Sequence, residues 1–446
     1  MVYAFFRWVF ATALSIYYRW TITEGAIPND GPLVICGNHP NGLIDPVAVM
    51  RLTKRPVRFM AKAPIFKMPV LGWIVKGMKC LPVYRKQDDP SQMNKNDETF
   101  KAAHAALAEG DCICIFPEGR SHSDPGLSPL KTGAARIALG AESEKGFSLG
   151  VKFVPVGLVY RRKGVFRSEV AVAVGEPIAA ASMRAEFERD PVAASKALTE
   201  KLDEALHKVT VNLDTWEDLP LIEAASRLYK AERKTPGDLR PYAAGLSALR
   251  ERDPARLESV RRRILSFDGY LHALRLPADE LDHVRPFRAL RFTVVQLARF
   301  LLGVAPAAVG VIAYVVPYQL IRALVAVVKL EEDIRSSVKL GVGVLLFPAW
   351  TALLTWLLWR QLGTPGLLDA AALPFCGLFA LAFIESEKAA FADARAYLAL
   401  RAHGTLRERL LTRRKALVDE LELLGKETGV LDASGAAQVS SQRAEM

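Results

Sequence analysis

The stretch PLVICGNHPNGLIDPVAVM, residues 32–50, decides the fold class of this chain. It begins with an apolar run typical of a buried strand, turns at Pro40-Asn41-Gly42 and continues as an apolar helix. The same alternation of short strands and helices extends to about residue 215, and it predicts an α/β domain with a mostly parallel sheet flanked by helices. The predicted strands are 32–38, 57–62, 80–85, 111–116, 152–160 and 169–177, and the predicted helices are 43–53, 66–77, 97–109, 131–140 (with Gly140 as its C-cap) and 191–213.

Composition excludes a disordered chain and a disulfide-stabilised one. Of 446 residues, 51% are hydrophobic, which is far above the range of disordered proteins. The chain has only 5 cysteines, and they lack the paired spacing of a zinc site. We therefore expect reduced thiols in a domain that faces the cytosol, and no metal. The cysteines are Cys36, Cys80, Cys112, Cys114 and Cys376.

The net charge of +11 requires an anionic partner. A nucleic-acid-binding protein would show a basic patch together with a recognisable binding motif, and the sequence has no such motif. Basic residues instead flank a long apolar stretch, as expected of a protein that meets anionic lipid head groups. These residues are Arg285, Arg288, Arg291 and Arg299 before the stretch, and Arg322, Lys329, Arg335 and Lys339 after it. We predict a lipid bilayer as the partner and no nucleic acid.

Apolar segments divide the chain into five parts. The uncharged run between Arg7 and Arg19 is too short for a bilayer core of about 30 Å, so it predicts a helix in the membrane interface. A shallow hairpin or span and a buried core helix are the alternatives. Segments 300–321, 340–359 and 370–384 are long or apolar enough for membrane helices. The first has basic flanks and two prolines, which favours a re-entrant helix, while the other two suggest a hairpin. The predicted parts are 1–24 (interface helix), 25–215 (α/β domain), 216–290 (charged helical connector), 291–390 (membrane region) and 391–446 (basic helix and flexible tail).

This division predicts that a chain ending near residue 285 would fold and retain activity. The alternative is that the 340–384 hairpin packs on the α/β domain and contributes to its site.

His39 and Asp45 form the first candidate for chemistry. A histidine can accept a proton near pH 7, and a carboxylate can orient its ring. On one helix the two side chains would point about 240° apart, so they can meet only if His39 lies in the turn before the helix. Taken alone, such a pair is more often structural than catalytic.

Cations follow two further strands. Arg85 ends the strand at 80–85, and FPEGRSHSDPGLSPLKTGAAR (116–136) places Arg120, Lys131 and Arg136 after another. Ligands of α/β sheets bind at the carboxyl ends of strands, where Arg and Lys would suit a phosphate. A surface turn with scattered charges is the alternative. Pro155, in the strand 152–160, indicates only an edge or an end of a strand.

Together, these blocks resemble the motifs of a known family. In order and spacing they are similar to the four blocks of the glycerolipid acyltransferases, the PlsC-like superfamily. The blocks are Asn38-His39 with Asp45, Arg85, Phe116-Pro117-Glu118-Gly119 and Val154-Pro155-Val156. That superfamily usually separates the His and Asp by four residues, whereas five separate them here. HPNGLIDP and SHSDPGLSPLKTG resemble the fungal glycerol-3-phosphate/dihydroxyacetone-phosphate acyltransferases, which also have five and also carry apolar segments after the catalytic domain.

The resemblance implies a role for each block. His39 would be the general base and Asp45 the carboxylate that holds it. Arg85, Glu118 and Gly119 would bind glycerol phosphate, and Pro155 would lie beside the acyl site. Arg120 and Lys131 are further candidate ligands of the acceptor, although the fungal pattern favours a small residue at position 120. His122 lacks a neighbouring turn and Asp, so it is a weak candidate for the base.

The implied function is acyl transfer from acyl-CoA or acyl carrier protein to glycerol 3-phosphate at a membrane, in phospholipid biosynthesis, with the catalytic domain facing the cytoplasm. A thioester is already activated, so the reaction needs no metal or prosthetic group, and no GxSxG elbow is present for an acyl-enzyme. Acylation of lysophosphatidate is the competing activity. A membrane scaffold with an inactive acyltransferase domain (25–215) is the alternative from another class.

Overall fold

The computed structural model describes residues 2–85, 89–235, 237–279, 281, 286–402 and 404–430. The chain forms two compact units. Unit 1 comprises residues 1–212 and 329–344, and unit 2 comprises residues 213–328 and 345–446. Segment 329–344, which falls inside the predicted membrane region, thus belongs with the α/β domain, so a chain ending near residue 285 would lack part of this unit. Arg285 and the last part of the predicted tail lie outside the described residues.

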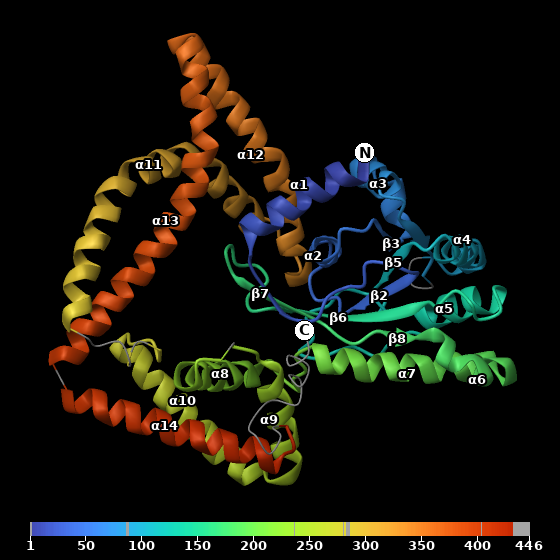
Figure 1. Ribbon diagram of the computed structural model, residues 1–446. Helices are drawn as coiled ribbons and strands as arrows, with labels where there is room; N and C mark the ends of the chain where they lie inside the picture. Colours follow the sequence, from blue (N-terminus) through green and yellow to red (C-terminus); the bar gives the residue numbers. More distant parts are fainter. Residues whose placement is uncertain are drawn as a thin grey trace. The chain divides into compact units, whose positions relative to one another are not determined.

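Unit 1 is built on one mostly parallel sheet, as the sequence predicts. Its described strands run in the order β1-β7-β6-β2-β5-β3-β4, with β8 paired to β6 (Figure 1). Only the pairs of β6 with β7 and β8 are antiparallel among them. The strands are β1 (Arg19–Glu24), β2 (Leu33–Gly37), β3 (Val57–Lys62), β4 (Leu81–Val83), β5 (Cys112–Ile115), β6 (Lys152–Tyr160), β7 (Glu169–Val174) and β8 (Ile178–Ala179).

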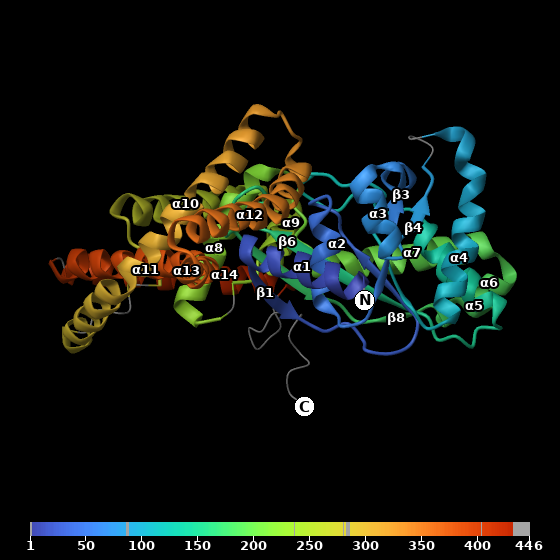
Figure 2. The same cartoon turned by 90° about the horizontal axis from the view of Figure 1, so that it is seen from above.

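Helices cover both faces of this sheet. In β2, Leu33 and Ile35 join a core with α1 and α2, whereas Val34 and Cys36 join a second core with α4, α5 and α7. Successive side chains of a strand point to opposite faces, so a strand buried on both faces is apolar throughout. Figure 2 shows α4 and α5 side by side. The helices of this unit are α1 (Val2–Tyr17), α2 (Ile44–Leu52), α3 (Pro69–Gly77), α4 (Asn96–Ala108), α5 (Gly133–Glu144), α6 (Arg184–Arg189) and α7 (Pro191–Val209).

Pro155 lies inside the sheet, not at the edge or end of a strand that its residue type indicates. β6 has β2 on one side and pairs on the other side first with β8, through Phe153, and then with β7, from Val156 onward. Pro155 falls between these two pairings. The missing N–H of a proline is tolerated where a strand changes partners, because the ladder is interrupted there.

Gly140 is not the C-cap of its helix, because α5 continues to Glu144. A Cβ at this position would lie 2.6 Å from Cε1 of His104. The glycine therefore gives room for the packing of α4 against α5, and the prediction of a helix end at this residue is wrong.

Helix α1 is partly embedded in unit 1. Phe6 and Leu14 are buried in the core with α2, while Phe5 and Trp8 on the other side of the helix are exposed. The helix ends at Tyr17, and β1 follows within the predicted 1–24 interface segment. One side of α1 is therefore core and the other is free to meet a membrane interface.

Unit 2 contains four polar helices joined by ion pairs. Asp218, just before α8, is buried and accepts hydrogen bonds from Arg250 at 2.8 Å and from Arg261. Burial alone would raise the pKa of this carboxyl, but the two guanidinium groups outweigh burial and lower it. Arg233 of α8 binds Glu422 of α14 at 2.7 Å. The helices are α8 (Leu219–Arg233), α9 (Arg240–Arg252), α10 (Pro254–Leu274) and α14 (Gly404–Glu427).

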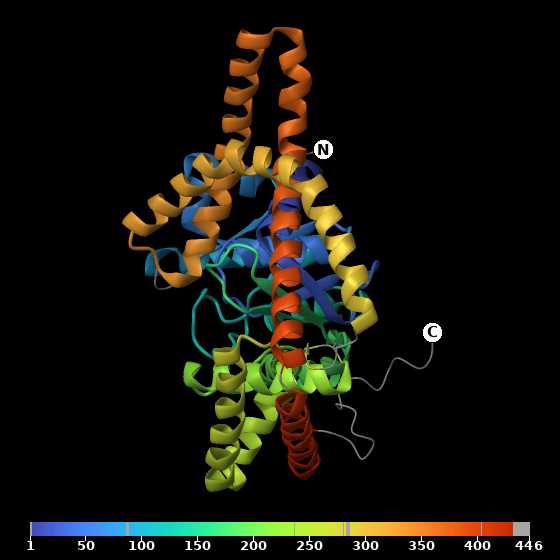
Figure 3. The same cartoon turned by 90° about the vertical axis from the view of Figure 1, so that its left-hand side faces the viewer.

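Three further helices are long and apolar enough to cross a membrane: α11 (Pro286–Val327), α12 (Glu332–Leu362) and α13 (Thr364–Ala402). Figure 3 shows α11 as an arch whose two ends point the same way, and α12 with α13 as a hairpin. Pro306 and Pro317 lie within α11, and prolines commonly bend a helix without ending it. The structure shows one continuous, bent helix that contains both prolines (Figure 3).

Small residues bring α11 and α13 together. A Cβ at Gly310 would lie 2.1 Å from the backbone oxygen of Cys376, so only glycine fits at this crossing. Between α11 and α12, Trp350 Nε1 donates to the carbonyl of Ala313 at 2.7 Å. Small residues at crossings and hydrogen bonds between helices are typical of helix association in lipid.

Candidate active site

His39 and Asp45 meet at the start of α2. Asp45 lies in the first turn of the helix, and His39 lies in the preceding turn, as their spacing requires. His39 Nδ1 is 2.9 Å from Asp45 Oδ2. Gly42 permits the turn between them, because its φ of 43° lies in the left-handed region that side chains disfavour. The structure thus brings together the two residues predicted to act as base and orienting carboxylate.

The carboxylate of Asp45 is fixed from several directions. It is fully buried, and its Oδ2 also accepts the backbone N–H of Asn41 at 2.7 Å. Its Oδ1 accepts the hydroxyl of Tyr160, at the end of β6, at 2.7 Å. Burial, together with the nearby Asp45 charge, raises the pKa of Tyr160 well above its usual value, so this hydroxyl stays a donor. Together with the contact to His39, these hydrogen bonds compensate for the burial of the Asp45 carboxylate.

This network defines the protonation pattern of His39. A carboxylate can only accept, so Nδ1 of the neutral ring carries the hydrogen and Nε2 presents a lone pair. Nε2 has no hydrogen bond to any other residue that the structure describes. The ring also stacks on Phe116, with centroids 4.1 Å apart and planes 12° apart. A partly exposed histidine held in this way is arranged to accept a proton.

Glu118, a predicted ligand of the acceptor, has its carboxylate turned inward. Oε1 accepts the backbone N–H of His39 at 2.7 Å, and Oε2 accepts the backbone N–H of Ser128 at 2.8 Å. Oε2 also pairs with Nε2 of His122. Glu118 is 4% exposed, so in this geometry it ties the loops around His39 together. A direct contact of Glu118 with substrate stays a prediction.

His122 is buried and fully engaged. Its Nε2 faces Glu118, and its Nδ1 accepts the backbone N–H of Asp124 at 3.1 Å. With both ring nitrogens occupied, it lacks the open lone pair that His39 has. His122 is therefore the weaker candidate for the base.

Arg85, Gly119 and Lys131 gather at one turn. Arg85 donates to the carbonyl oxygen of Gly119 at 3.1 Å. Gly119 has a φ of 75°, and a Cβ there would lie 2.5 Å from Nζ of Lys131. The turn thus needs glycine for its backbone angle and for the close approach of the lysine. Two cations on one backbone turn are suited to an anion such as a phosphate.

Arg120 and Pro155 have other partners than the Gly119 turn. Arg120 is exposed and binds Asp124 at 2.8 Å in a surface ion pair. Pro155 is buried within β6, where it is paired in register with Cys36. Among the described residues, neither of the two forms a hydrogen bond or ion pair with His39. Their roles toward substrate stay predictions.

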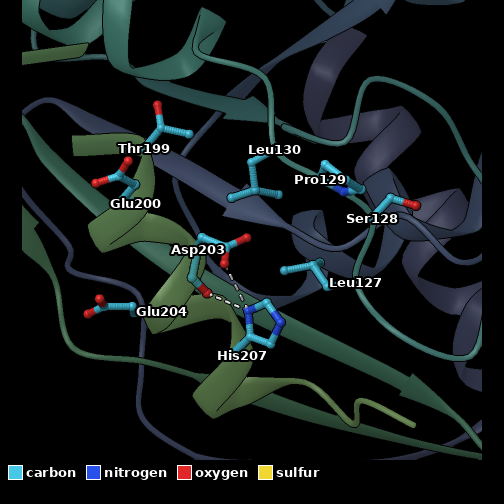
Figure 4. A pocket seen from close by; sticks show the side chains of 9 residues that line it. All are labelled: Leu127, Ser128, Pro129, Leu130, Thr199, Glu200, Asp203, Glu204 and His207. Atoms are coloured by element: carbon cyan, nitrogen blue, oxygen red, sulfur yellow. Dashed lines mark hydrogen bonds and ion pairs between the residues drawn. The ribbon is translucent and has the colours of Figure 1, made fainter. Parts of the chain in front are cut away.

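A hollow of about 610 Å³ opens elsewhere on unit 1 (Figure 4). Residues 127–130 and one side of α7 line it, and α7 contributes Glu200, Asp203, Glu204 and His207. Three carboxylates would repel a phosphorylated acceptor or a nucleotide-bearing donor. None of the predicted site residues lines it, so we assign the hollow no part in the reaction. In the described part of the chain, no group of three or more His, Cys, Asp or Glu side chains is arranged to hold a metal ion.

The sequence did not point to several residues of this network. Tyr160 is the last residue of a predicted strand, and ligands of α/β sheets bind at the carboxyl ends of strands, so its position could have indicated a role in the site. Phe116 lies in a quoted motif, yet its sequence position does not reveal the stack on His39. Lys163 is buried and donates from Nζ to the Pro40 carbonyl at 2.9 Å and to Ser123 Oγ at 2.8 Å. No sequence pattern places it at the base loop.

Comparisons with known proteins identify a family for part of this chain. Residues 21–159 match the Acyltransferase family model. The stretch contains His39, Asp45, Arg85 and the Glu118 turn in the order described above. Residues 21–159 thus form a domain of the Acyltransferase family, and the relatives described below support a place in the PlsC-like glycerolipid acyltransferase superfamily. From here on we refer to residues 21–159 as the acyltransferase domain.

Several relatives resemble this chain. Glycerol-3-phosphate O-acyltransferase 2 of Saccharomyces cerevisiae is 38% identical over 136 residues, which is 30% of this chain and 18% of the yeast protein. Glycerol-3-phosphate O-acyltransferase 1 of the same yeast is 24% identical over 383 residues, covering 64% of this chain and 49% of its own length. The chloroplastic 1-acyl-sn-glycerol-3-phosphate acyltransferase BAT2 of Brassica napus is 30% identical over 151 residues, or 33% of this chain and 40% of the plant protein.

One solved structure has a loose likeness to part of this chain. The 1-acyl-sn-glycerophosphate acyltransferase PlsC of Thermotoga maritima aligns over 46% of this chain and 76% of its own, with 17% identity and a TM-score of 0.34. The chain spans about half or less of the length of the curated relatives named above.

Proposed function

We propose that this protein is a membrane-bound O-acyltransferase that moves a fatty acyl chain from acyl-CoA or acyl carrier protein to glycerol 3-phosphate. The observation that carries the proposal is the state of His39. Its Nδ1 is hydrogen-bonded to the fully buried carboxylate of Asp45, and its Nε2 forms no hydrogen bond with another described residue. That arrangement is required for removing a proton from an acceptor hydroxyl.

The reaction then needs no covalent enzyme intermediate. The acceptor hydroxyl oxygen attacks the thioester carbonyl carbon while its proton passes to Nε2 of His39. Asp45 stabilises the imidazolium that forms, because the ion pair lies in a buried site. As the C–S bond breaks, His39 returns the proton to the departing thiolate, and the products are an ester and a free thiol. The protein's residues supply position and proton transfer, and the thioester supplies the chemical activation.

The acceptor phosphate has a candidate site at the Gly119 turn. Arg85 and Lys131 would provide a planar fork and a point charge, respectively. Gly119 keeps this turn open to both. The proposal thus requires the two cations to affect the acceptor and not the acyl donor.

Glycerol 3-phosphate is the preferred acceptor because the two yeast relatives carry that substrate in their names. The plant relative is named for 1-acyl-sn-glycerol-3-phosphate, so lysophosphatidate is the second candidate. Both acceptors present a hydroxyl close to a phosphate. The acyl donor rests on chemistry alone, since either thioester would serve.

The apolar helices support a membrane location. Three described helices have the length and composition to cross a bilayer. Exposed aromatic side chains on α1 and α3, such as Trp8 and Trp73, suit the head-group interface. We propose that the acyltransferase domain faces the cytoplasm, where positively charged flanks are favoured.

One set of assays tests the proposal. Membranes containing the protein are incubated with acyl-CoA or acyl carrier protein and with labelled glycerol 3-phosphate or lysophosphatidate. We expect labelled lysophosphatidate from glycerol 3-phosphate, and no product from the His39→Ala protein. Product only from lysophosphatidate would favour the second candidate. No transfer with either acceptor and either donor, by a folded protein, would support the inactive scaffold.

A further inference from the structure

The beginning of helix α12 belongs to unit 1, which also contains the acyltransferase domain. Residues 329–344 are part of unit 1, although they lie nearly three hundred residues after His39 in sequence. Asp333, Ser336 and Leu340 are buried, and their spacing places them on one side of the helix. Leu340 joins the core that contains α1 and α2. The start of a membrane-length helix is therefore embedded in this unit.

The embedded side of α12 contacts the turn that carries His39. Ser337 Oγ accepts the backbone N–H of Leu43 at 3.0 Å. Gly42 packs directly on the helix, since a Cβ there would lie 2.9 Å from the Asp333 carbonyl oxygen and 3.0 Å from Ser337 Oγ. The turn between the base and Asp45 thus rests on α12.

The same side of α12 also contacts the loop after the Glu118 turn. Ser121 Oγ donates to Asp333 Oδ2 at 2.5 Å. This loop supplies His122, whose backbone N–H donates to the carbonyl of His39 at 3.1 Å. Asp333 is therefore linked through this loop to the backbone of His39.

A third loop completes the contact. Ser336 Oγ donates to the carbonyl of Lys163 at 2.7 Å, and Lys339 Nζ donates to the carbonyl of Gly164 at 2.6 Å. Lys163 in turn donates from Nζ to the Pro40 carbonyl, next to His39. Burial lowers the pKa of Lys163, and the carboxylates of Glu332, Asp45, Asp333 and Asp124 oppose that shift. Three loops around the base thus share one support.

We propose that residues 333–340 of α12 form a positioning element that holds the His39 turn and its neighbouring loops in the geometry needed for acyl transfer. This inference rests on the proposed function. The loops have no sheet or helix of their own to fix them, so their order depends on tertiary contacts. A displacement of a catalytic group by about 1 Å can cost about 100-fold in rate. Asp333 and Ser337 are positioning residues because they act through the loops and touch no reacting atom.

The test uses full-length protein with single substitutions. Asp333→Ala removes the acceptor for Ser121, whereas Asp333→Asn keeps an oxygen there. Glu331→Ala is the matched control, since Glu331 is an exposed carboxylate close by on the same segment. We expect Asp333→Ala to lower kcat by about 10- to 100-fold with little change in the KM for the acyl donor. Asp333→Asn should recover most of the rate, and Glu331→Ala should behave as wild type.

Hydrogen exchange supplies a readout that is independent of activity. Peptides covering 39–43 and 120–124 should exchange faster in Asp333→Ala, while peptides from β2 and β6 should not change. If Asp333→Ala does not fold, Ser337→Ala removes only the contact with Leu43 and should show the same effects in milder form. Wild-type kcat and unchanged loop exchange in these variants would overturn the proposal. If the wild-type protein transfers no acyl group, the proposed function fails, and loop exchange alone decides whether α12 holds the loops.

Discussion

Three neighbours hold His39 in place. Asp45 binds Nδ1, Phe116 covers one ring face, and Glu118 binds the backbone N–H of the same residue. General base catalysis contributes about 10²- to 10⁴-fold. We therefore expect His39→Ala to lose at least 100-fold in kcat while its thermal unfolding and membrane attachment stay near wild type.

A histidine of unit 2 provides the control for this variant. His272 of α10 is exposed, so His272→Ala should retain full activity. Asp45→Asn should also lose much of the rate, because the amide can no longer stabilise the imidazolium. Near wild-type turnover by His39→Ala would rule out His39 as the base.

Substitutions of Arg85 and of Arg120 should have different effects on KM, although both arginines lie near the Gly119 turn. Arg85 donates to the turn itself, whereas Arg120 is paired with Asp124 at the surface. Removing a charge-assisted contact costs about 1.5–3 kcal/mol, or about 10- to 150-fold. Arg85→Ala should raise the KM for the phosphorylated acceptor by that factor and leave the KM for the acyl donor nearly unchanged. Arg120→Ala should change neither, and equal effects of Arg85→Ala on both substrates would argue against a phosphate contact.

Thiols and a phenol with raised pKa values make the stability of unit 1 sensitive to alkaline pH. Burial raises the pKa of Cys80 to about 11 and that of Cys112 to about 12, from an ordinary value of 9.0. Burial likewise raises the pKa of Tyr18 to about 12, from 10.0. Above pH 9 the unfolded chain releases protons that the folded chain retains, so the free energy of unfolding falls as the pH rises toward these folded-state values.

Thermal unfolding in detergent between pH 8 and pH 11 measures this effect. We expect the unfolding temperature to decline above about pH 9, and the decline should be shallower in Cys112→Ala, which removes one of these groups. An unfolding temperature that does not change over this range would contradict the prediction.

At the scale of whole elements, the strands and helices of the α/β domain could largely be predicted from sequence. Their apolar runs are buried on both faces, and such runs are visible without a structure. β1 escaped prediction because RWTITE follows an apolar helix and alternates too weakly to stand out. Segment 329–344 escaped because its polar residues lie between two membrane-length stretches, and only tertiary contacts reveal their place.

The candidate site, too, could be predicted from the sequence only in part. The pairing of His39 with Asp45 follows from spacing and turn residues, and so it was predictable. The support from Tyr160, Lys163 and Asp333 comes from positions up to about three hundred residues away, and side-chain contacts of this kind leave no local pattern.

The extent of unit 1 leads to a prediction about truncation. A chain that ends near residue 285 loses Asp333, Ser336 and Leu340, so the half-buried Ser121 hydroxyl loses its acceptor and the Lys163 carbonyl keeps only the Tyr18 hydroxyl as a donor. Unpaired buried polar groups cost about 1–3 kcal/mol each. We expect this shortened protein to unfold at a lower temperature and to have little activity with substrates presented in detergent. A chain ending at residue 344 should do better on both measures. Full activity of the shorter protein would show that α12 is dispensable for the site.

For the whole molecule, the arch of α11 determines how many times the chain changes sides of a bilayer. Unit 1 contains residues from before and after α11, so we predict that both ends of this helix emerge on the same side of the bilayer. The helix therefore enters and returns, contributing no net crossing. The α12–α13 hairpin contributes two, and α14 then binds α8 through Arg233 and Glu422, which requires a return to the starting side.

We therefore predict an even number of crossings, with Ser182 of unit 1 and Thr412 of unit 2 in the same compartment. In sealed vesicles, cysteines introduced at Ser182 and at Thr412 should react with a membrane-impermeant maleimide from the same side. A cysteine at Thr364, between α12 and α13, should react from the opposite side. Labelling of positions 182 and 412 from opposite sides would mean that α11 crosses the bilayer.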